Sequence, residues 1–249
     1  MTTQSFIGIC GIQNSTDLAN IVRRAPSVLD GTNHFLMVGI KKVTDKITVQ
    51  NTFDAVRPFV HCDFTAQEPF EHTVERTMDQ SKDFVRGLQL NVLPWMEVDF
   101  APLWCKLKLQ YPDLTLMLQA HRIIIEQYTP IQIASRLRGL PVKYILFDAS
   151  QSRGIAYNPN FMRPYIDAVY QERPEIGVVI AGGLSGPRMD SLFAPLVSEY
   201  PALSCDAFGQ LQNPGTQLLS WPQIDAYLSA WKGIIARGRS TTYNRPMLR

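Results

Sequence analysis

The sequence has no long apolar run. No stretch approaches the roughly 18 consecutive apolar residues that a membrane-spanning helix needs, so we expect no membrane partner. It also lacks a surplus of one charge, since 24 Lys and Arg against 22 Asp and Glu leave a net charge of +2. Nucleic-acid binding requires a clustered basic face, so we expect no nucleic-acid partner. Residues 1–5 lack the basic and apolar segments of a secretion signal, which predicts a cytoplasmic location.

Patterns typical of metal sites and disulfides are missing as well. The four cysteines (Cys10, Cys62, Cys105 and Cys205) form no CxxC pair, and the 4 histidines form no HxH or HxxxH cluster. Structural zinc sites are built from such closely spaced ligands. The sequence therefore predicts no structural zinc and fits a reduced, cytoplasmic protein.

What the sequence does contain is a regular alternation of strand-like and helix-like segments. Strand-like apolar runs occur at 6–12, 34–40, 59–65, 88–92, 114–119, 144–148, 176–181 and 202–208. Helical patterns occur at 14–25, 51–56, 69–86, 99–110, 129–139, 159–172, 186–198 and 221–236. This alternation in 249 residues predicts one α/β domain over 1–249, a (β/α)8 TIM barrel of eight parallel strands. Residues 238–249 are expected to form a polar tail.

An open, doubly wound sheet is the structural alternative. That fold commonly carries a glycine-rich GxGxxG turn after its first strand. The corresponding stretch here, residues 10–14, reads Cys-Gly-Ile-Gln-Asn and lacks the pattern. The closed barrel is therefore the favoured prediction.

Two ionisable residues stand at the ends of predicted strands. Cys10 ends the first strand and Asp148 the sixth. Because all strands of a parallel barrel end at one face, these residues are expected to be neighbours, one suited to be a base and the other an acid. A cysteine base needs a lowered pKa, and Lys41, Lys42 and Arg153 are candidate cations. Alternatively, Cys10 is a small buried apolar residue and Asp148 caps the next loop.

Glycines follow the last two predicted strands. Gly182 and Gly183 come after the strand at 176–181, and Gly209 and Gln210 follow the last one. Glycines let backbone N–H groups approach an anion, a following helix adds its positive end, and barrels commonly bind phosphate at these loops. We therefore expect a phosphate site here, with two ordinary glycine turns as the alternative.

Further polar side chains near strand ends are candidates for substrate binding. Ser150 and Arg153 lie in the loop after the sixth strand, where Arg153 is placed to pair with Asp148 or with a phosphate. Gln89 and Asn91 lie at the end of the fourth strand. Together with Asp63 and Gln119 on neighbouring strands, they are suited to orient substrate hydroxyls.

With these motifs in place, the chain resembles phosphoribosylanthranilate isomerase, a (β/α)8 enzyme of tryptophan biosynthesis. The family's first strand reads roughly Lys-Ile-Cys-Gly-Ile, and residues 9–12 read Ile-Cys-Gly-Ile. Its fourth strand reads Gln-Leu-His-Gly, close to Gln-Leu-Asn at 89–91, and its seventh ends in Ala-Gly-Gly-Leu, as do residues 181–184. The resemblance implies that Cys10 is the general base and Asp148 the general acid in an Amadori rearrangement of a phosphoribosyl amine. It implies no metal and no organic cofactor.

Other motifs of the family are changed. The turn after strand two, whose arginine handles the anthranilate carboxylate, reads Gly-Ile-Lys-Lys-Val at 39–43 and has no arginine. The eighth-strand motif Ser-Ser-Gly-Val-Glu becomes Ala-Phe-Gly-Gln-Leu at 207–211, and the loop after Asp148 lacks Gly-Gly-Thr-Gly. The proton-transfer pair is therefore better preserved than the groups that bind the substrate.

Three functions stay open at this point. One is the isomerase itself, and another is a related barrel acting on a different phosphorylated, sugar-type substrate. The third is a non-catalytic barrel that binds phosphate, a nucleotide or another protein. Fold resemblance alone does not choose among them. The favoured partner is a small phosphorylated substrate, and the chain is expected to be a monomer or a homodimer.

Overall fold

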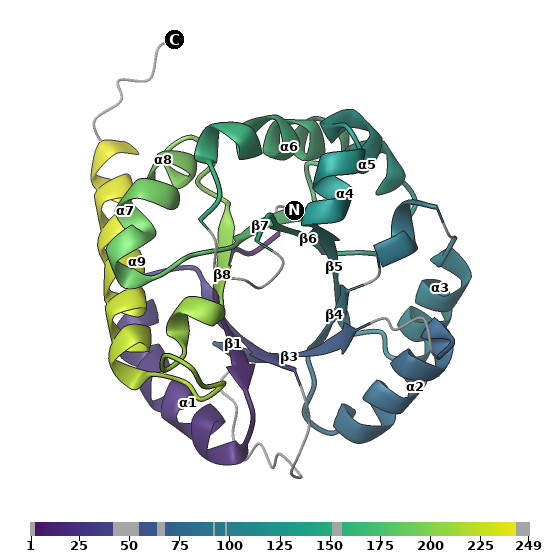
Figure 1. Ribbon diagram of the computed structural model, residues 1–249, viewed down its shortest axis with the longest axis horizontal. Coiled ribbons are helices and arrows are strands. Elements are labelled where there is room, and N and C mark those ends of the chain that lie inside the picture. The colour runs from purple at the N-terminus through teal and green to yellow at the C-terminus, as the bar shows by residue number, and fades with distance from the viewer. Residues whose placement is uncertain are drawn as a thin grey trace.

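The computed structural model describes residues 3–41, 55–63, 68–91, 93–97, 99–150 and 156–242. Its centre is a closed barrel of eight parallel strands, in which sequence neighbours pair and the last strand pairs with the first. Helices form an outer ring around the barrel (Figure 1). The predicted (β/α)8 fold is confirmed.

The strands follow one another around the ring. They are β1 (Phe6–Ile12), β2 (Phe35–Ile40), β3 (Val56–Asp63), β4 (Gly87–Asn91), β5 (Thr115–His121), β6 (Tyr144–Asp148), β7 (Gly177–Ala181) and β8 (Ser204–Ala207). The α-helices are α1 (Ser15–Leu29), α2 (Phe70–Ser81), α3 (Ala101–Gln110), α4 (Arg122–Gln127), α5 (Pro130–Arg136), α6 (Pro159–Glu172), α7 (Met189–Leu192), α8 (Ala194–Val197) and α9 (Trp221–Thr242). Short 3-10 turns occur at Leu93–Met96, Gly186–Arg188 and Gly209–Leu211. Among the described helices, none has both the length and the apolarity needed to cross a membrane.

Local signals in the sequence place several helix ends. The Asn14 side chain accepts a hydrogen bond from the Asp17 N–H at the start of α1, as expected of an N-cap. Thr129 and Gln132 form a capping box at the start of α5, directly before its first full turn. Gly139 follows that helix with a φ of 73°, the left-handed conformation that favours glycine.

Three predicted helices end differently in the structure. Pro26 was expected to end the first helix, but it lies inside α1, whose last turn buries Val28 and Leu29. Helix α2, predicted over 69–86, ends at Ser81. The chain turns there because the Ser81 carbonyl accepts hydrogen bonds from the N–H groups of Phe84 and Val85. At the C-terminus, α9 continues into the predicted polar tail as far as Thr242. Residues 243–249 lie outside the described part of the chain.

The segment after β7 departs most from its prediction. A single helix was expected over 186–198, but the structure has a 3-10 turn, α7 and α8 in succession. The turn packs closely on α9, since a Cβ at Gly186 would lie 2.8 Å from Ala226. Pro195 in α8 has no N–H to continue a longer helix. The helix α4 was not predicted, and the helix expected at 51–56 lies mostly outside the described residues, with Val56 starting β3.

Alternate side chains of each strand face the helices or the barrel interior. Those facing the helices form the large outer core. The interior cluster comprises Phe6, Cys10, Phe35, Met37, Phe59, Met117, Tyr144, Leu146, Val179 and Ala181. It is apolar towards the amino ends of the strands, and polar side chains follow towards the carboxyl ends.

Aromatic rings fill the amino-terminal end of the barrel. The Phe6 ring centroid lies 5.1 Å from that of Phe35 and 5.2 Å from that of Tyr144. Glycines make room for these rings, because a Cβ at Gly87 would lie 2.5 Å from the Phe59 ring. We call these four rings, Phe6, Phe35, Phe59 and Tyr144, the aromatic plug. It closes the barrel interior at the amino-terminal ends of the strands.

We expect Gly87→Ala to lower the free energy of unfolding by about 1–3 kcal/mol, because its methyl group overpacks against the Phe59 ring. Gly233→Ala is the matched control. It lies within α9, where a Cβ would meet only Arg237 at 3.6 Å, so the substitution is expected to stabilise the protein by roughly 0.5–1 kcal/mol. Urea denaturation of both variants checks the difference. Equal effects of the two substitutions would contradict the tight packing at Gly87.

Candidate active site

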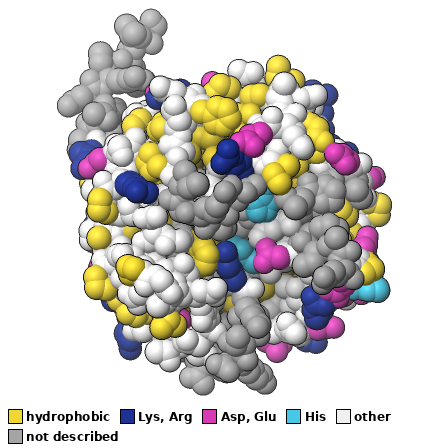
Figure 2. Space-filling model, in the orientation of Figure 1, with side chains coloured by type: hydrophobic (Ala, Val, Ile, Leu, Met, Phe, Trp, Pro, Cys, Tyr) yellow, Lys and Arg dark blue, Asp and Glu magenta, His cyan; other side chains and the backbone are white. Residues whose placement is uncertain are grey.

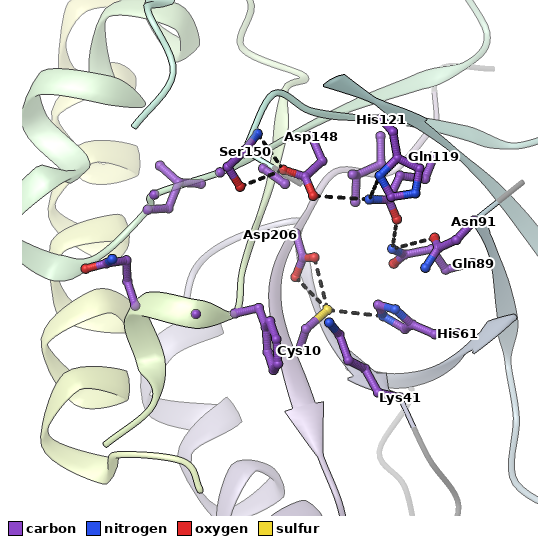
Figure 3. Close-up of a pocket in the computed structure, with 18 of the residues that line it drawn as sticks. Cys10, Lys41, His61, Gln89, Asn91, Gln119, His121, Asp148, Ser150 and Asp206 are labelled. Carbon is purple, nitrogen blue, oxygen red and sulfur yellow. Dashed lines mark hydrogen bonds between the residues drawn. The ribbon is translucent and has the colours of Figure 1, made fainter. Parts of the chain in front are cut away.

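Polar and ionisable side chains gather where the strands end. They lie above the aromatic plug and line one pocket (Figure 3). Those side chains are Cys10, Lys41, His61, Asp63, Gln89, Asn91, Gln119, His121, Asp148, Ser150, Asp206 and Gln210. On the face shown in Figure 2, basic, acidic and histidine side chains lie together near the centre. The pocket opens to solvent at its mouth, and the space that protein atoms leave free in it is about 610 Å³ with that solvent included.

The Cys10 thiol contacts the Asp206 carboxylate. Its Sγ lies 3.0 Å from Oδ2 and 3.2 Å from Oδ1 of Asp206, and the thiol donates the hydrogen. Glycines on β1 and β2 make this contact possible. A Cβ at Gly8 would lie 2.4 Å from Asp206 Oδ1, and a Cβ at Gly39 would lie 2.3 Å from Cys10 Sγ. Both positions must therefore lack a side chain for the pair to form.

The environment keeps the Cys10 thiol protonated. Burial raises its pKa well above the usual value, and the neighbouring charge of Asp206 raises it further. Lys41 lowers the Cys10 pKa, as expected of a candidate cation, but burial and Asp206 outweigh it. The other two candidate cations, Lys42 and Arg153, lie outside the described residues. The free protein therefore holds a thiol at this position.

Asp206 is a titratable group that the sequence predictions did not include. Burial raises its pKa to about 7, although the Cys10 hydrogen bond and Lys41 both lower it. The carboxyl therefore exchanges its proton near neutral pH, which suits acid–base catalysis. Its signal in the sequence was the same as that of Asp148, a carboxylate near the end of an apolar strand.

His61 flanks the same thiol from β3. Its Nε2 lies 3.3 Å from Cys10 Sγ. Burial lowers its pKa to about 4, so the ring is neutral at neutral pH. Its Nδ1 is buried and has no hydrogen-bond partner among the described residues. A neutral imidazole and a protonated thiol thus lie side by side in the free protein.

Asp148 lies in the pocket and also binds the loop that follows it. Its Oδ1 accepts from the Ser150 N–H at 2.9 Å and from the Ser150 hydroxyl at 2.8 Å. Its Oδ2 accepts from Gln119 Nε2 at 3.2 Å. The two readings of Asp148 were alternatives in the sequence, yet here one carboxylate both caps its loop and lines the pocket.

Three amide side chains on β4 and β5 connect Asp63 with Asp148. Asn91 Nδ2 donates to Asp63, and Gln119 Nε2 donates to Asp148. Between them, Gln89 Nε2 donates to Gln119 Oε1 at 2.7 Å and to Asn91 Oδ1 at 3.3 Å. We call Asn91, Gln89 and Gln119 the amide chain. It places hydrogen-bonding groups along one side of the pocket, where the sequence predicted groups for substrate hydroxyls.

The glycine loops after β7 and β8 line the pocket on another side. Gly182 and Gly183 have φ angles of 110° and 67°, which non-glycine residues rarely adopt. Gly209 begins the 3-10 turn after β8, next to Gln210. The helix dipole expected after Gly183 is weak, because α7 has only 4 residues. Any anion here would therefore be bound mainly by backbone N–H groups.

One pocket thus collects most of the residues predicted from the sequence. Its lining includes Cys10, Gln89, Asn91, Asp148, Ser150, Gly182, Gly183, Gly209 and Gln210. Arg153 lies outside the described residues. Sequence reasoning missed Asp206, His61 and His121, which also line the pocket. Within the described ranges, no group of three or more His, Cys, Asp or Glu side chains has the arrangement to hold a metal ion.

Solved structures share this architecture at low sequence identity. The chain is similar to phosphoribosylanthranilate isomerase from Thermus thermophilus, with a TM-score of 0.59 and 16% identity over 92% of this chain and 98% of that one. The catalytic domain of a chitinase from Pyrococcus furiosus has a TM-score of 0.53 and 11% identity, over 99% of this chain and 98% of that one. Tryptophan synthase from M. tuberculosis has a TM-score of 0.52 and 12% identity, over 95% of this chain and 92% of that one. No family model matches the chain, and no curated protein sequence does.

At these identities the likeness establishes the barrel fold alone. Several of the similar structures are enzymes with unlike activities. What fold and pocket define together is a (β/α)8 barrel with an ionisable pocket at the carboxyl ends of its strands.

Asp206 and His61 give opposite dependences of stability on pH. Asp206 keeps its proton up to about pH 7 in the folded state but loses it near pH 4 when unfolded, so its contribution to stability falls as pH rises between those values. His61 has a pKa of about 4 when folded and about 6.5 when unfolded, so its contribution rises over that window.

Relative to wild type, Asp206→Asn is therefore expected to gain stability as the pH rises from 4 to 7, by roughly 1.4 kcal/mol per unit of the removed pKa shift. His61→Gln is expected to lose stability relative to wild type over pH 4 to 6.5. Urea denaturation at a series of pH values measures both differences. Curves that stay parallel to wild type would show that neither group titrates abnormally.

Proposed function

We propose that this protein is an enzyme that isomerises a small phosphorylated, sugar-type amine by acid–base catalysis, as in an Amadori rearrangement. One observation carries the proposal: Cys10, Asp148 and the glycines of the β7 and β8 loops line the same pocket. These groups supply what the reaction needs, namely a base, an acid and backbone donors for a phosphate.

The base in this proposal is a pair of residues. Cys10 carries a proton in the free protein, and Asp206 lies 3.0 Å away as its acceptor. When a substrate is bound, the thiol proton moves to Asp206, and the thiolate removes the proton from C2 of the sugar. Cys10 is then protonated again by the C2 proton. Since the pKa of Asp206 is about 7, the carboxyl accepts the thiol proton and later releases it to solvent near neutral pH, while Asp148 takes up a proton for the next turnover.

Asp148 is the proposed acid. In its protonated form it gives its proton to the ring oxygen of the sugar, and the ring opens to a protonated imine. Removal of the C2 proton by Cys10 then gives an enolamine, which tautomerises to the ketone. One proton leaves Asp148 and one is taken up from carbon, so the isomerisation consumes no net proton.

Phosphate binding in this proposal rests on the loops. Gly182, Gly183 and Gly209 line the pocket, and their backbone N–H groups are the proposed donors to the phosphate. Lys41 also lines it, with its Nζ 3.6 Å from the centroid of the Phe208 ring, and adds a positive charge to a site that must accept an anion.

The charged groups of the pocket favour a different phosphorylated, sugar-type substrate over phosphoribosylanthranilate. Asp63, Asp148 and Asp206 line the pocket together with Lys41. Among the described lining residues, Lys41 is the one Lys or Arg side chain. A substrate with a phosphate and a further carboxylate, such as phosphoribosylanthranilate, would bring two anions to this one cation, whereas a phosphorylated amino sugar with a neutral amine substituent brings only its phosphate. We therefore favour such a substrate.

Turnover tests the proposal directly. Phosphoribosylanthranilate and N-phenyl phosphoribosylamine, which lacks the carboxylate, are offered to the purified protein, and product formation is followed. Cys10→Ser and Asp148→Asn are each expected to lower kcat by about 10²–10⁴-fold, the usual contribution of one proton-transfer group. Cys105→Ser, which changes an exposed cysteine, is the control and should match wild type. Activity that survives both active-site substitutions would overturn the assigned roles.

The pH profile tests the pairing of Cys10 with Asp206. Because Asp206 must be ionised to accept the thiol proton, kcat/KM of the wild type is expected to rise with pH through about 7. In Asp206→Asn the activity should be lower and this rise should be absent. A rise that persists unchanged in Asp206→Asn would assign it to another group.

A further inference from the structure

The hydrogen bonds at the two ends of the amide chain set the direction of the whole chain. At one end Asn91 turns its NH₂ group to Asp63, and at the other end Gln119 turns its NH₂ group to Asp148. Both amides then present their oxygens to Gln89.

Gln89 in the middle has a single arrangement that satisfies these neighbours. Its NH₂ group faces two oxygens and donates one hydrogen to each. Both hydrogens of that group are thereby used, and the amide oxygen is turned away from the chain. Swapping the oxygen and nitrogen of Gln89 would place its oxygen against two oxygens.

The Gln89 oxygen is consequently left without a donor. Gln89 is 2% exposed, and its Oε1 is buried with no hydrogen-bond partner in the described part of the protein. The residue lines the pocket (Figure 3). A buried acceptor without a donor costs free energy, and in proteins such groups are satisfied by a bound water or a ligand.

We propose that Gln89 Oε1 is a specificity determinant that accepts a hydrogen bond from a hydroxyl group on the carbon chain of a polyhydroxylated phosphate ligand. The inference rests on the proposed function, whose substrate class it narrows to sugar phosphates that keep this hydroxyl. A ligand that lacks the hydroxyl leaves this buried acceptor unpaired. The pocket therefore selects against deoxy compounds.

The contact also reaches the proposed acid. A hydroxyl on Gln89 Oε1 polarises the amide, which strengthens its donation to Gln119, and Gln119 in turn donates to Asp148. The contact that recognises the substrate is thereby linked through Gln119 to the Asp148 carboxyl group.

The test is a binding cycle that needs no turnover. Ribitol 5-phosphate, an unreactive open-chain polyol, and its 2-deoxy, 3-deoxy and 4-deoxy analogues are titrated into the protein by calorimetry. With wild type, one of the three analogues is expected to bind about 10- to 100-fold more weakly than the parent, the usual effect of leaving a buried polar group unpaired. The other two should bind nearly as tightly as the parent.

Gln89→Met removes the acceptor at similar side-chain length. In this variant the same deoxy analogue should bind less than about threefold more weakly than ribitol 5-phosphate. The substitution and the missing hydroxyl each remove the same hydrogen bond, so their effects do not add. Gln110→Met, on the exposed end of α3, is the control and should retain the full wild-type pattern. A crystal structure of the wild-type complex should place a ligand hydroxyl within hydrogen-bond distance of Gln89 Oε1, whether or not the variant folds.

Three results would overturn the inference: equal affinity for all four compounds, a deoxy effect that persists in Gln89→Met, or no binding of ribitol 5-phosphate to wild type. Failure of the proposed function is recognised separately. If the deoxy effect and its loss in Gln89→Met are observed but no phosphoribosyl amine is turned over, the recognition site stands and the isomerase assignment falls.

Discussion

The hydrogen bond between the Cys10 thiol and the Asp206 carboxyl group is the interaction on which the rest of the pocket depends. Both groups are buried, and burial raises the pKa of each. Two acidic groups in contact at low solvent exposure favour a state with a proton between them. The barrel accommodates this pair only because β1 and β2 carry glycines at positions 8 and 39, where any side chain would occupy the space of the sulfur or the carboxylate.

Around this pair the pocket divides into two sides with different chemistry. The side formed by β1, β3 and β8 contains the hydrogen-bonded pair of Cys10 and Asp206, with the His61 ring beside the Cys10 sulfur. The side formed by β4, β5 and β6 contains neutral amides whose orientations are locked between two carboxylates. The glycine loops after β7 and β8 border both sides. In the proposed function, a substrate bound between them would meet the Cys10–Asp206 base on one side, and the amide chain and the Asp148 acid on the other.

The sequence was sufficient to predict the barrel, because its apolar strand pattern and helix caps are local signals. It also predicted that residues at strand ends share a face, which is why Cys10 and Asp148 were singled out. Asp206 offered the same signal, a carboxylate near the end of a strand, but the sequence did not distinguish it as a group that contacts Cys10. The raised pKa of Asp206 comes from its burial in the closed barrel, and its contact with Cys10 joins residues 196 positions apart, which no local pattern reports. The split helix after β7 was missed for a similar reason, since the close packing of Gly186 on α9 is a tertiary contact.

The pairing of β1 with β8 has a consequence for how the protein is made. Cys10 and Asp206 come from the first and last strands, whose registers meet at Gly8 and Asp206. During synthesis, β1 leaves the ribosome long before β8 exists, and until then one edge of β1 is an open sheet edge. The proton-sharing pair therefore forms only when the ring closes. An incomplete barrel would expose the Cys10 thiol to solvent, so the chemical reactivity of this one sulfur distinguishes a finished molecule from an unfinished one.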